Sequence, residues 1–221
     1  AVGLARAPGW VRRPAALPFL ALSRPLARIL ARFDHDIAER GLPAAATEAL
    51  AALGASLAVS ARPPSRGPLL VLSNHPGAYD AFALMAAVGR ADLAILAADR
   101  SFLRALPALA RHLVFVPDGP LARVASLRRA MAHLREGRAL LHFPAGRIEP
   151  DPAFAEGGGA GLLAPWMPGT DALVRVAGSV GGSVVAASVS GVHSPRAKRS
   201  LVNRLAERRG ITTLAPLLQL A

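Results

Sequence analysis

The sequence has no cysteine, one tyrosine, two tryptophans and a single lysine, Lys198. A chain without cysteine has no disulfide, no thiolate zinc site and no cysteine nucleophile. Only 5% of the residues are aromatic, and no long basic run occurs. The stacking surfaces and charge runs that are typical of nucleic-acid-binding proteins are therefore scarce, and we expect no nucleic-acid partner.

Several catalytic signatures are also missing. The sequence has neither the Gly-x-Ser-x-Gly turn of serine hydrolases nor a Gly-x-x-x-x-Gly-Lys phosphate loop. Five histidines lack metal-ligand spacing to carboxylates, namely His35, His112, His133, His142 and His193. We therefore expect no metal and no cofactor.

Acidic residues are few. Fourteen Asp and Glu stand against 26 Lys and Arg, which gives a formal net charge of +12 and a sequence pI near 11.8. One interpretation is compositional, because an Ala-, Gly- and Arg-rich chain can reflect a GC-rich genome. The other is attraction to anions, either phosphorylated substrates or an anionic membrane surface.

No long hydrophobic run qualifies as a membrane span. The most apolar stretch, residues 41–61, is mostly alanine and contains Glu48. The first forty residues differ, since apolar positions 22, 26, 29, 30 and 33 share one helical face and Arg24, Arg28 and Arg32 share another. This pattern predicts a basic amphipathic helix, which either lies in a bilayer interface or packs on the domain as an ordinary surface helix.

A Pro-rich segment, residues 62–68, divides the chain into an N-terminal helical region, 1–61, and a second domain, 67–221. In the first region we predict a helix from Thr47, as its N-cap, to Ala58. In the second, apolar runs predict strands near 69–73, 93–97, 113–116, 139–143 and 183–189. Helices are predicted near 79–88, 101–111, 121–136, 171–177 and 196–208. The alternation favours an α/β fold with a largely parallel sheet flanked by helices.

The first motif follows the strand that ends at Ser73. It reads Asn74-His75-Pro76-Gly77-Ala78-Tyr79-Asp80. A histidine at the end of a strand can take a proton from a hydroxyl, and a carboxylate on its other ring nitrogen fixes the tautomer. The alternative is a histidine that satisfies a helix cap.

The second motif follows the strand 139–143 and reads Phe143-Pro144-Ala145-Gly146-Arg147-Ile148-Glu149-Pro150. A Pro/Gly turn exposes backbone N–H groups, and Arg147 adds a planar cation, so the turn suits an anion. By itself the motif favours the alternative, an ordinary strand-to-loop turn with a solvent-exposed arginine. Residues 152–170 form a Gly-rich loop whose apolar residues, such as Trp166, could bound an acyl-chain channel or contact lipid, or form a surface excursion.

The two motifs, about seventy residues apart, together resemble those of the glycerolipid acyltransferase family, which includes the 1-acylglycerol-3-phosphate acyltransferases. The resemblance covers residues 67–191. It implies transfer of a fatty acyl group from a thioester, on coenzyme A or acyl carrier protein, to a lipid hydroxyl. It also implies that His75 is the general base and Asp80 its orienting partner. The substrate-binding residues would be Asn74, Pro144, Gly146 and Arg147.

The second motif departs from the family pattern. Ala145 stands where the family has glutamate, for which Glu149 could partly substitute, and Arg147 is displaced by one position. A further family arginine, which normally follows a Phe-containing strand, is absent after Val116, and the nearest arginine is Arg123. These differences suit another acceptor, such as an amino-acid-containing or glycosylated lipid.

We thus expect a peripheral acyltransferase on the cytoplasmic face of the cell membrane, with an acyl thioester and a lipid acceptor as its substrates. Acyl carrier protein is a candidate partner. Two alternatives remain open at the level of the sequence. One is a non-catalytic relative that binds anionic lipid, and the other is an acyl-thioesterase that uses water as the acceptor.

Overall fold

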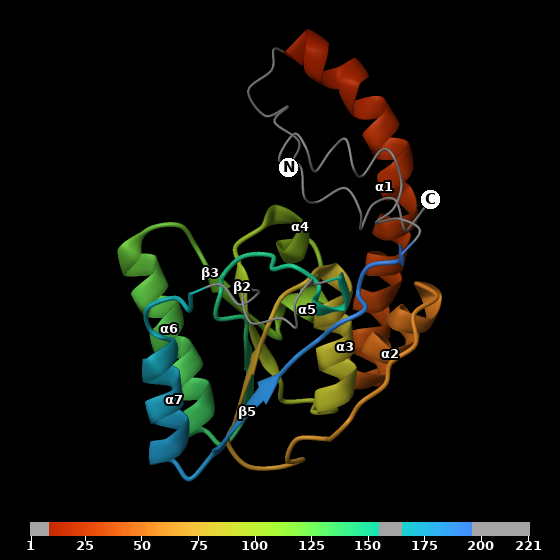
Figure 1. Ribbon diagram of the computed structural model, residues 1–221. Coiled ribbons are helices and arrows are strands. Elements are labelled where there is room, and N and C mark those ends of the chain that lie inside the picture. Colours follow the sequence, from red (N-terminus) through yellow and green to blue (C-terminus); the bar gives the residue numbers. More distant parts are fainter. Residues whose placement is uncertain (1–8, 155–164, 196–221) are drawn as a thin grey trace. The chain divides into compact units, whose positions relative to one another are not determined.

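The computed structural model describes residues 9–154 and 165–195 (Figure 1). Five parallel strands form one sheet in the order β3-β2-β4-β1-β5. The strands are β1 (Leu69–Ser73), β2 (Ala94–Ala98), β3 (Leu113–Val116), β4 (Ala139–His142) and β5 (Ser183–Ala187). The α/β fold with a parallel sheet is therefore confirmed, and each predicted strand lies within two residues of its observed bounds.

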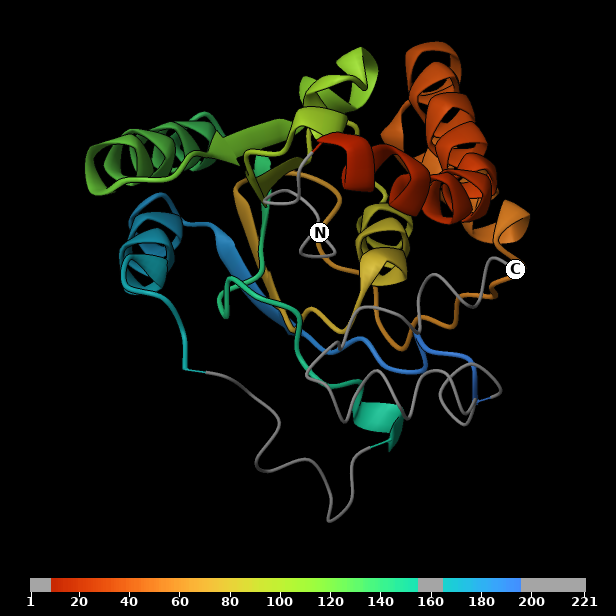
Figure 2. The same cartoon turned by 90° about the horizontal axis from the view of Figure 1, so that it is seen from above.

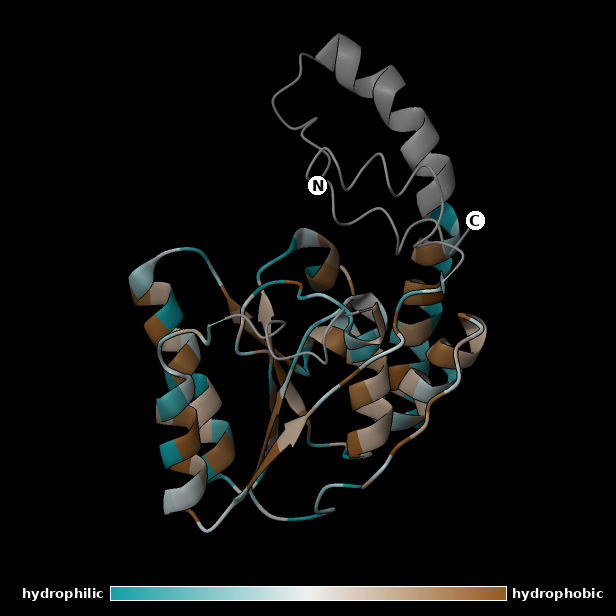
Figure 3. Ribbon diagram, in the orientation of Figure 1, coloured by the Kyte–Doolittle hydropathy of each residue, from teal (hydrophilic) through white to brown (hydrophobic). Residues whose placement is uncertain are grey.

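The central strands are buried on both faces. All five residues of β1 and the first three of β4 are buried, and the two strands pair from Leu69 with Ala139 to Leu72 with His142. Continuous apolar runs of this kind are what a parallel sheet covered on both sides requires. The strands accordingly form the hydrophobic centre of the sheet in Figure 3.

Helices cover the two faces unequally (Figures 1 and 2). One face carries α6 (Pro120–Arg135) and α7 (Thr170–Ser179), which contact each other and the sheet. The other carries α3 (Ala78–Val88), on which α2 (Leu42–Ala52) packs. Two of these helices end where a glycine adopts positive φ: Gly89 at 66° after α3 and Gly137 at 79° after α6. Glycine favours such helix ends because it has no Cβ.

Two predicted helices differ in the structure. The helix predicted at 47–58 is instead α2, Leu42–Ala52, and the cap at Thr47 is wrong. Thr47 lies inside the helix, where its hydroxyl donates to the carbonyl of Pro43 at 3.0 Å, and the helix begins after Gly41. In the sequence, Pro43 indicates the true start of this helix, because proline is favoured in the first turn of a helix.

The helix predicted at 101–111 is two short helices, α4 (Ser101–Arg104) and α5 (Pro107–Ala110). Proline disfavours helical geometry in the residue before it and has no N–H to continue the ladder, so Pro107 divides the segment. A one-turn 3₁₀ helix follows β4 at Pro152–Phe154. The helix predicted at 196–208 lies outside the described residues.

The chain divides into two units, residues 33–192 and residues 1–32 with 193–221. Helix α1 (Gly9–Arg40) enters the first unit at Phe33, whose ring meets that of Phe82 edge-on, with centroids 4.8 Å apart. The division predicted at residues 61–67 stays a prediction, as does the location of the amphipathic helix in a bilayer. No helix among the described residues is long and apolar enough to cross a membrane.

Candidate active site

The first motif lies at a switch point of the sheet. Strands β1 and β4 are neighbours, but the chain runs from β1 into α3 on one face and from β4 towards α7 on the opposite face (Figure 2). The connections that leave the two strands therefore lead to opposite faces of the sheet, and the carboxyl edge at such a point is the usual ligand site of open α/β sheets. His75 follows β1 at this edge, and Phe143 follows β4.

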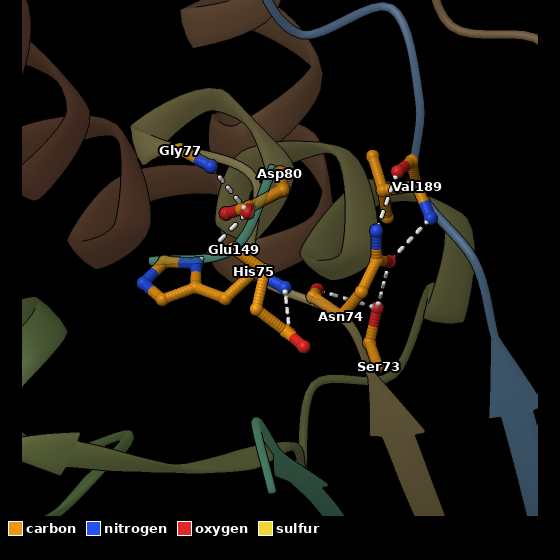
Figure 4. A network of polar contacts seen from close by, with 7 residues as sticks. All are labelled: Ser73, Asn74, His75, Gly77, Asp80, Glu149 and Val189. Atoms are coloured by element: carbon orange, nitrogen blue, oxygen red, sulfur yellow. Dashed lines mark hydrogen bonds and ion pairs between the residues drawn. The ribbon is translucent and has the colours of Figure 1, made fainter. Parts of the chain in front are cut away.

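His75 and Asp80 form a pair (Figure 4). The Nδ1 atom of His75 lies 2.8 Å from Oδ2 of Asp80, and the same oxygen accepts the N–H of Gly77 at 2.9 Å. Because a carboxylate only accepts hydrogen bonds, the neutral ring carries its proton on Nδ1, which leaves the lone pair on Nε2. Nε2 points away from Asp80 (Figure 4), so the free nitrogen of the ring is the basic one.

Burial distinguishes the two partners. The Asp80 side chain is 0% exposed and the His75 side chain 25%. The second oxygen of Asp80, Oδ1, has no hydrogen-bond partner among the described residues. A buried carboxylate in contact with the ring stabilises the positive charge that the ring carries after it has taken a proton. The pair is thus arranged to stabilise an imidazolium.

Glu149 holds the backbone of His75. Its Oε2 accepts the His75 N–H at 3.0 Å, and its own N–H donates to the His75 carbonyl at 2.8 Å. Glu149 is buried. The loop after β4 is therefore tied to the loop after β1 at the residue that carries the base, and the sequence, in which the two lie 74 residues apart, held no indication of that partner.

Two further side chains tie these loops to the segment after β5. The amide of Asn74 donates to the carbonyl of Val189 at 2.9 Å and accepts its N–H at 2.7 Å. Asp151 accepts the N–H groups of Ala153 and Gly191 at 3.0 and 2.8 Å. Asn74 thus pairs with the backbone of Val189, while its predicted role in substrate binding stays a prediction.

A pocket of about 340 Å³ adjoins the pair, between the carboxyl ends of β2, β3 and β4 and the helices α6 and α7. Phe143 lines it and also stacks on the His75 ring, with centroids 4.3 Å apart. His75 itself does not line the pocket. The apolar wall includes Leu96, Val116, Leu127, Met167 and Leu173, and two cations, Arg100 and Arg123, also line it.

The second motif contributes to the pocket unevenly. Gly146 lines it at φ 62°, and a Cβ at this position would collide with the sulfur of Met167. Pro144 is buried, and its carbonyl accepts the Met167 N–H at 2.8 Å. Arg147 is exposed and does not line the pocket. The structure therefore brings Gly146 and Arg123 to one cavity, whereas anion binding by Arg147 stays a prediction.

His142 is a second pocket histidine with a different environment. Its Nε2 lies 3.0 Å from the hydroxyl of Thr170, which in turn donates to the carbonyl of Met167. Burial lowers the pKa of His142 to about 4, from 6.5. This histidine is neutral at physiological pH and serves as a packed, hydrogen-bonded residue of the pocket wall. Among the described residues no three histidine or carboxylate side chains gather as metal ligands.

Comparisons with known proteins concern a protein family, curated proteins and solved structures. Residues 57–190, more than half of the chain, match the family model described as Acyltransferase. No curated protein matches the chain. Among solved structures, the crystal structure of the 1-acyl-sn-glycerophosphate (LPA) acyltransferase PlsC from Thermotoga maritima is similar over 75% of each chain, with 20% sequence identity and a TM-score of 0.44.

Proposed function

We propose that this chain, which belongs to the acyltransferase family, transfers a fatty acyl group from an acyl thioester to the hydroxyl of a lipid acceptor. The family that the two motifs predict is confirmed by the match over residues 57–190. The donor, on coenzyme A or acyl carrier protein, the lipid acceptor and the role of His75 belong to the proposal.

The observation that carries the proposal is the contact of 2.8 Å between His75 Nδ1 and Asp80 Oδ2. It supports Nε2 of His75 as a general base, because the ring is oriented and its imidazolium stabilised at the edge of a substrate-sized pocket. Phe143, which lines the pocket and stacks on the ring, supports placing the reacting groups beside it.

The chemical step needs no covalent intermediate. Nε2 of His75 takes the proton of the acceptor hydroxyl as that oxygen attacks the thioester carbonyl. The carbon–sulfur bond breaks, the acyl group becomes an ester of the acceptor, and the imidazolium returns its proton to the leaving thiolate. The buried carboxylate of Asp80 stabilises the cation that forms between the two transfers.

The cations of the pocket suit a negatively charged group of donor or acceptor. Arg100 and Arg123 line the cavity and are exposed to solvent at its wall. A guanidinium binds phosphate in a planar, two-point manner. We therefore assign the anionic part of a substrate to this side, together with Gly146, and keep Arg147 as the additional candidate. The enzyme would work as a peripheral protein at the cytoplasmic face of the cell membrane.

The test is release of thiol from acyl-coenzyme A by the purified protein, with and without a panel of lysolipids. Because the chain has no cysteine, a thiol reagent detects no background from the enzyme. The test variants are His75→Ala and His75→Asn, and the control is His35→Ala, which removes an exposed histidine of α1.

We expect acceptor-dependent release that both His75 variants reduce by roughly 10³-fold or more and the control leaves intact, since loss of a general base that also carries charge removes most of the chemical step. Release without acceptor, with free fatty acid as product, would identify a thioesterase. If no release occurs with coenzyme A, acyl carrier protein is the next donor. Failure with both donors, combined with lipid binding, would identify a non-catalytic relative.

A further inference from the structure

Five large apolar side chains are exposed near the pocket. They are Phe102, Leu121, Val124, Ile148 and Trp166, and we call them the rim. Leu121 is the extreme case, since 86% of it is exposed. Single apolar residues on a surface are ordinary, but several around one cavity mark an interaction surface.

The rim gathers at one edge of the sheet because the strands are parallel. Phe102 lies in α4 after β2, Leu121 and Val124 lie in the first turns of α6 after β3, and Ile148 and Trp166 lie in the loop after β4. All three strands end at the same edge, where the pocket also lies. Val124 lines the pocket itself, and Trp166 precedes the lining residue Met167. The rim therefore lies at the edge of the sheet that holds the cavity, and two of its members lie at the cavity wall or next to it.

Positive charge accompanies the rim. Arg100, Arg123 and Arg147 are exposed in the same three segments, the loop after β2, the start of α6 and the loop after β4, and make no ion pair with any described residue. Arg104 differs, because it pairs with Asp99 at 2.6 Å. Exposed apolar side chains that include a tryptophan, interspersed with arginines, are the composition that binds the interface of an anionic bilayer.

We propose that the rim lies against an anionic phospholipid bilayer, with the apolar side chains among the acyl chains and the three arginines at the phosphate groups. The pocket then opens into the lipid, so that an acceptor and a long acyl chain can enter without crossing water. A folded acidic partner is the alternative occupant of this surface, and the experiment below distinguishes it from a bilayer. The inference deepens the proposed function by naming the surface that meets the membrane, and its test does not depend on activity.

The sequence offers a direct probe. Trp10 and Trp166 are its two tryptophans, so Trp10→Phe leaves Trp166 as the one fluorophore of this kind. The protein is mixed with vesicles of equimolar phosphatidylcholine and phosphatidylglycerol, with and without bromine on the acyl chains. We expect the Trp166 emission to shift to the blue and to be quenched by the brominated lipid. Vesicles of phosphatidylcholine alone should bind more weakly, and added salt should weaken binding to the anionic vesicles.

Matched variants assign the binding to this surface. The rim variant combines Phe102→Ser with Leu121→Ser, which removes two rim side chains that do not line the pocket. The control combines Leu57→Ser with Val59→Ser, which removes two apolar residues of the segment before β1 that are 41% and 37% exposed. We expect the rim variant to weaken vesicle binding on the order of tenfold or more and the control to change it less than about twofold.

Three results would overturn the inference. The first is a wild-type protein that sediments with vesicles while Trp166 stays unquenched, since another part of the chain would then bind the lipid. The second is a rim variant that binds vesicles as well as the control does. The third is a rim variant that dissociates a homodimer, or loses an acidic carrier protein, without losing the bilayer. Failure of the proposed function is a separate result, because it shows as absent thiol release with intact quenching.

Discussion

Two neighbouring parts of the sheet edge are constructed differently. Around His75, buried polar side chains make hydrogen bonds that join the segments after β1, β4 and β5. On the other side of Phe143 from His75 lies the pocket, which has an apolar wall. Its two arginines, Arg100 and Arg123, are exposed and make no ion pair with any described residue. One region is fixed by many directional contacts, and the other is open to adjust to what binds.

The difference follows from what each region has to do. A general base must lie at a set distance and orientation from the proton that it takes, and misplacement by about 1 Å can cost on the order of 100-fold in rate. Recognition of a chain-like acyl group and a charged head group tolerates movement, since apolar contact and charge attraction depend weakly on angle. We therefore expect substitutions around His75 to lower kcat, and substitutions around the pocket to change KM or stability.

The strongest test on the fixed side is Asp80→Asn. The amide keeps the size of the carboxylate but cannot stabilise an imidazolium, and its NH₂ group can turn the ring to the wrong tautomer. We expect kcat to fall by roughly 10²- to 10⁴-fold with KM almost unchanged. Steady-state kinetics with the acceptor found for the wild type, alongside binding of a nonhydrolysable acyl thioester analogue, measures this. Unchanged kcat would show that Asp80 is a helix-capping residue only.

Acid should act on the pocket side through His142. Its pKa is about 4 in the folded protein, whereas a histidine in an unfolded chain has a pKa of 6.5. Between these values the unfolded chain takes up a proton that the folded chain refuses, so stability is complete above pH 6.5 and is lost as pH falls. The total loss by pH 4 is about 3 kcal/mol, at about 1.4 kcal/mol per pKa unit.

Urea unfolding at neutral pH and near pH 4.5 measures this effect. His142→Gln keeps a donor for the Thr170 hydroxyl without a titrating ring, so we expect its stability to fall less between the two pH values than that of the wild type. His35→Gln, which changes an exposed histidine, should behave as the wild type does. Parallel loss in all three proteins would show that His142 protonates freely in the folded state.

Much of this arrangement could be predicted from the sequence, for definable reasons. Apolar runs bounded by Pro and Gly indicated the strands. The spacing of five residues between His75 and Asp80 indicated the pair, because the chain turns before α3 and the first turn of that helix places Asp80 beside the ring. Contacts between distant loops have no such local pattern. Glu149 could be considered as a substitute for a missing carboxylate, but that its oxygen accepts the His75 N–H depends on the pairing of β1 with β4.

The pocket cations illustrate the same limit. The sequence favoured Arg147, because it follows a Pro/Gly turn, whereas the cavity is lined by Arg123 from α6 and Arg100 from the loop after β2. Arg100 lies in no motif, so nothing local distinguished it from the other arginines of an arginine-rich chain. Position at a sheet edge depends on strand order, which the sequence does not reveal.

Glu149 tests whether the fixed side depends on its links between loops. Glu149→Ala removes the acceptor of the His75 N–H, whereas Glu149→Gln retains a carbonyl oxygen there. We expect kcat to fall roughly 10- to 100-fold in the alanine variant, since a hydrogen bond to a carboxylate is worth about 1.5–3 kcal/mol. The glutamine variant should recover most of the loss.

A control variant, and separate measurement of kcat and KM, distinguish a positioning role of Glu149 from a purely structural one. Glu48→Ala removes an exposed carboxylate of α2 that pairs with Arg40, and it should leave both constants unchanged. A purely structural role of Glu149 predicts instead that alanine and glutamine lower the unfolding midpoint alike while the surviving folded protein keeps its kcat. That pattern would place Glu149 outside the positioning of His75.

The smallest effect is expected at the pocket, where Arg123 and Arg147 are the two candidates for binding the anionic part of a substrate. With short-chain substrates kept below their micelle concentration, we expect Arg123→Ala to raise KM by about three- to tenfold at unchanged kcat, because a solvent-exposed guanidinium that contacts a charged group is partly screened. Arg147→Ala should change KM less than about twofold, since Arg147 does not line the pocket. If Arg147→Ala raises KM more than Arg123→Ala does, the anion binds at the turn after Phe143, as the sequence predicts. Additional salt should reduce the difference between wild type and the more sensitive variant, because an open, exposed contact is screened and a buried one is not.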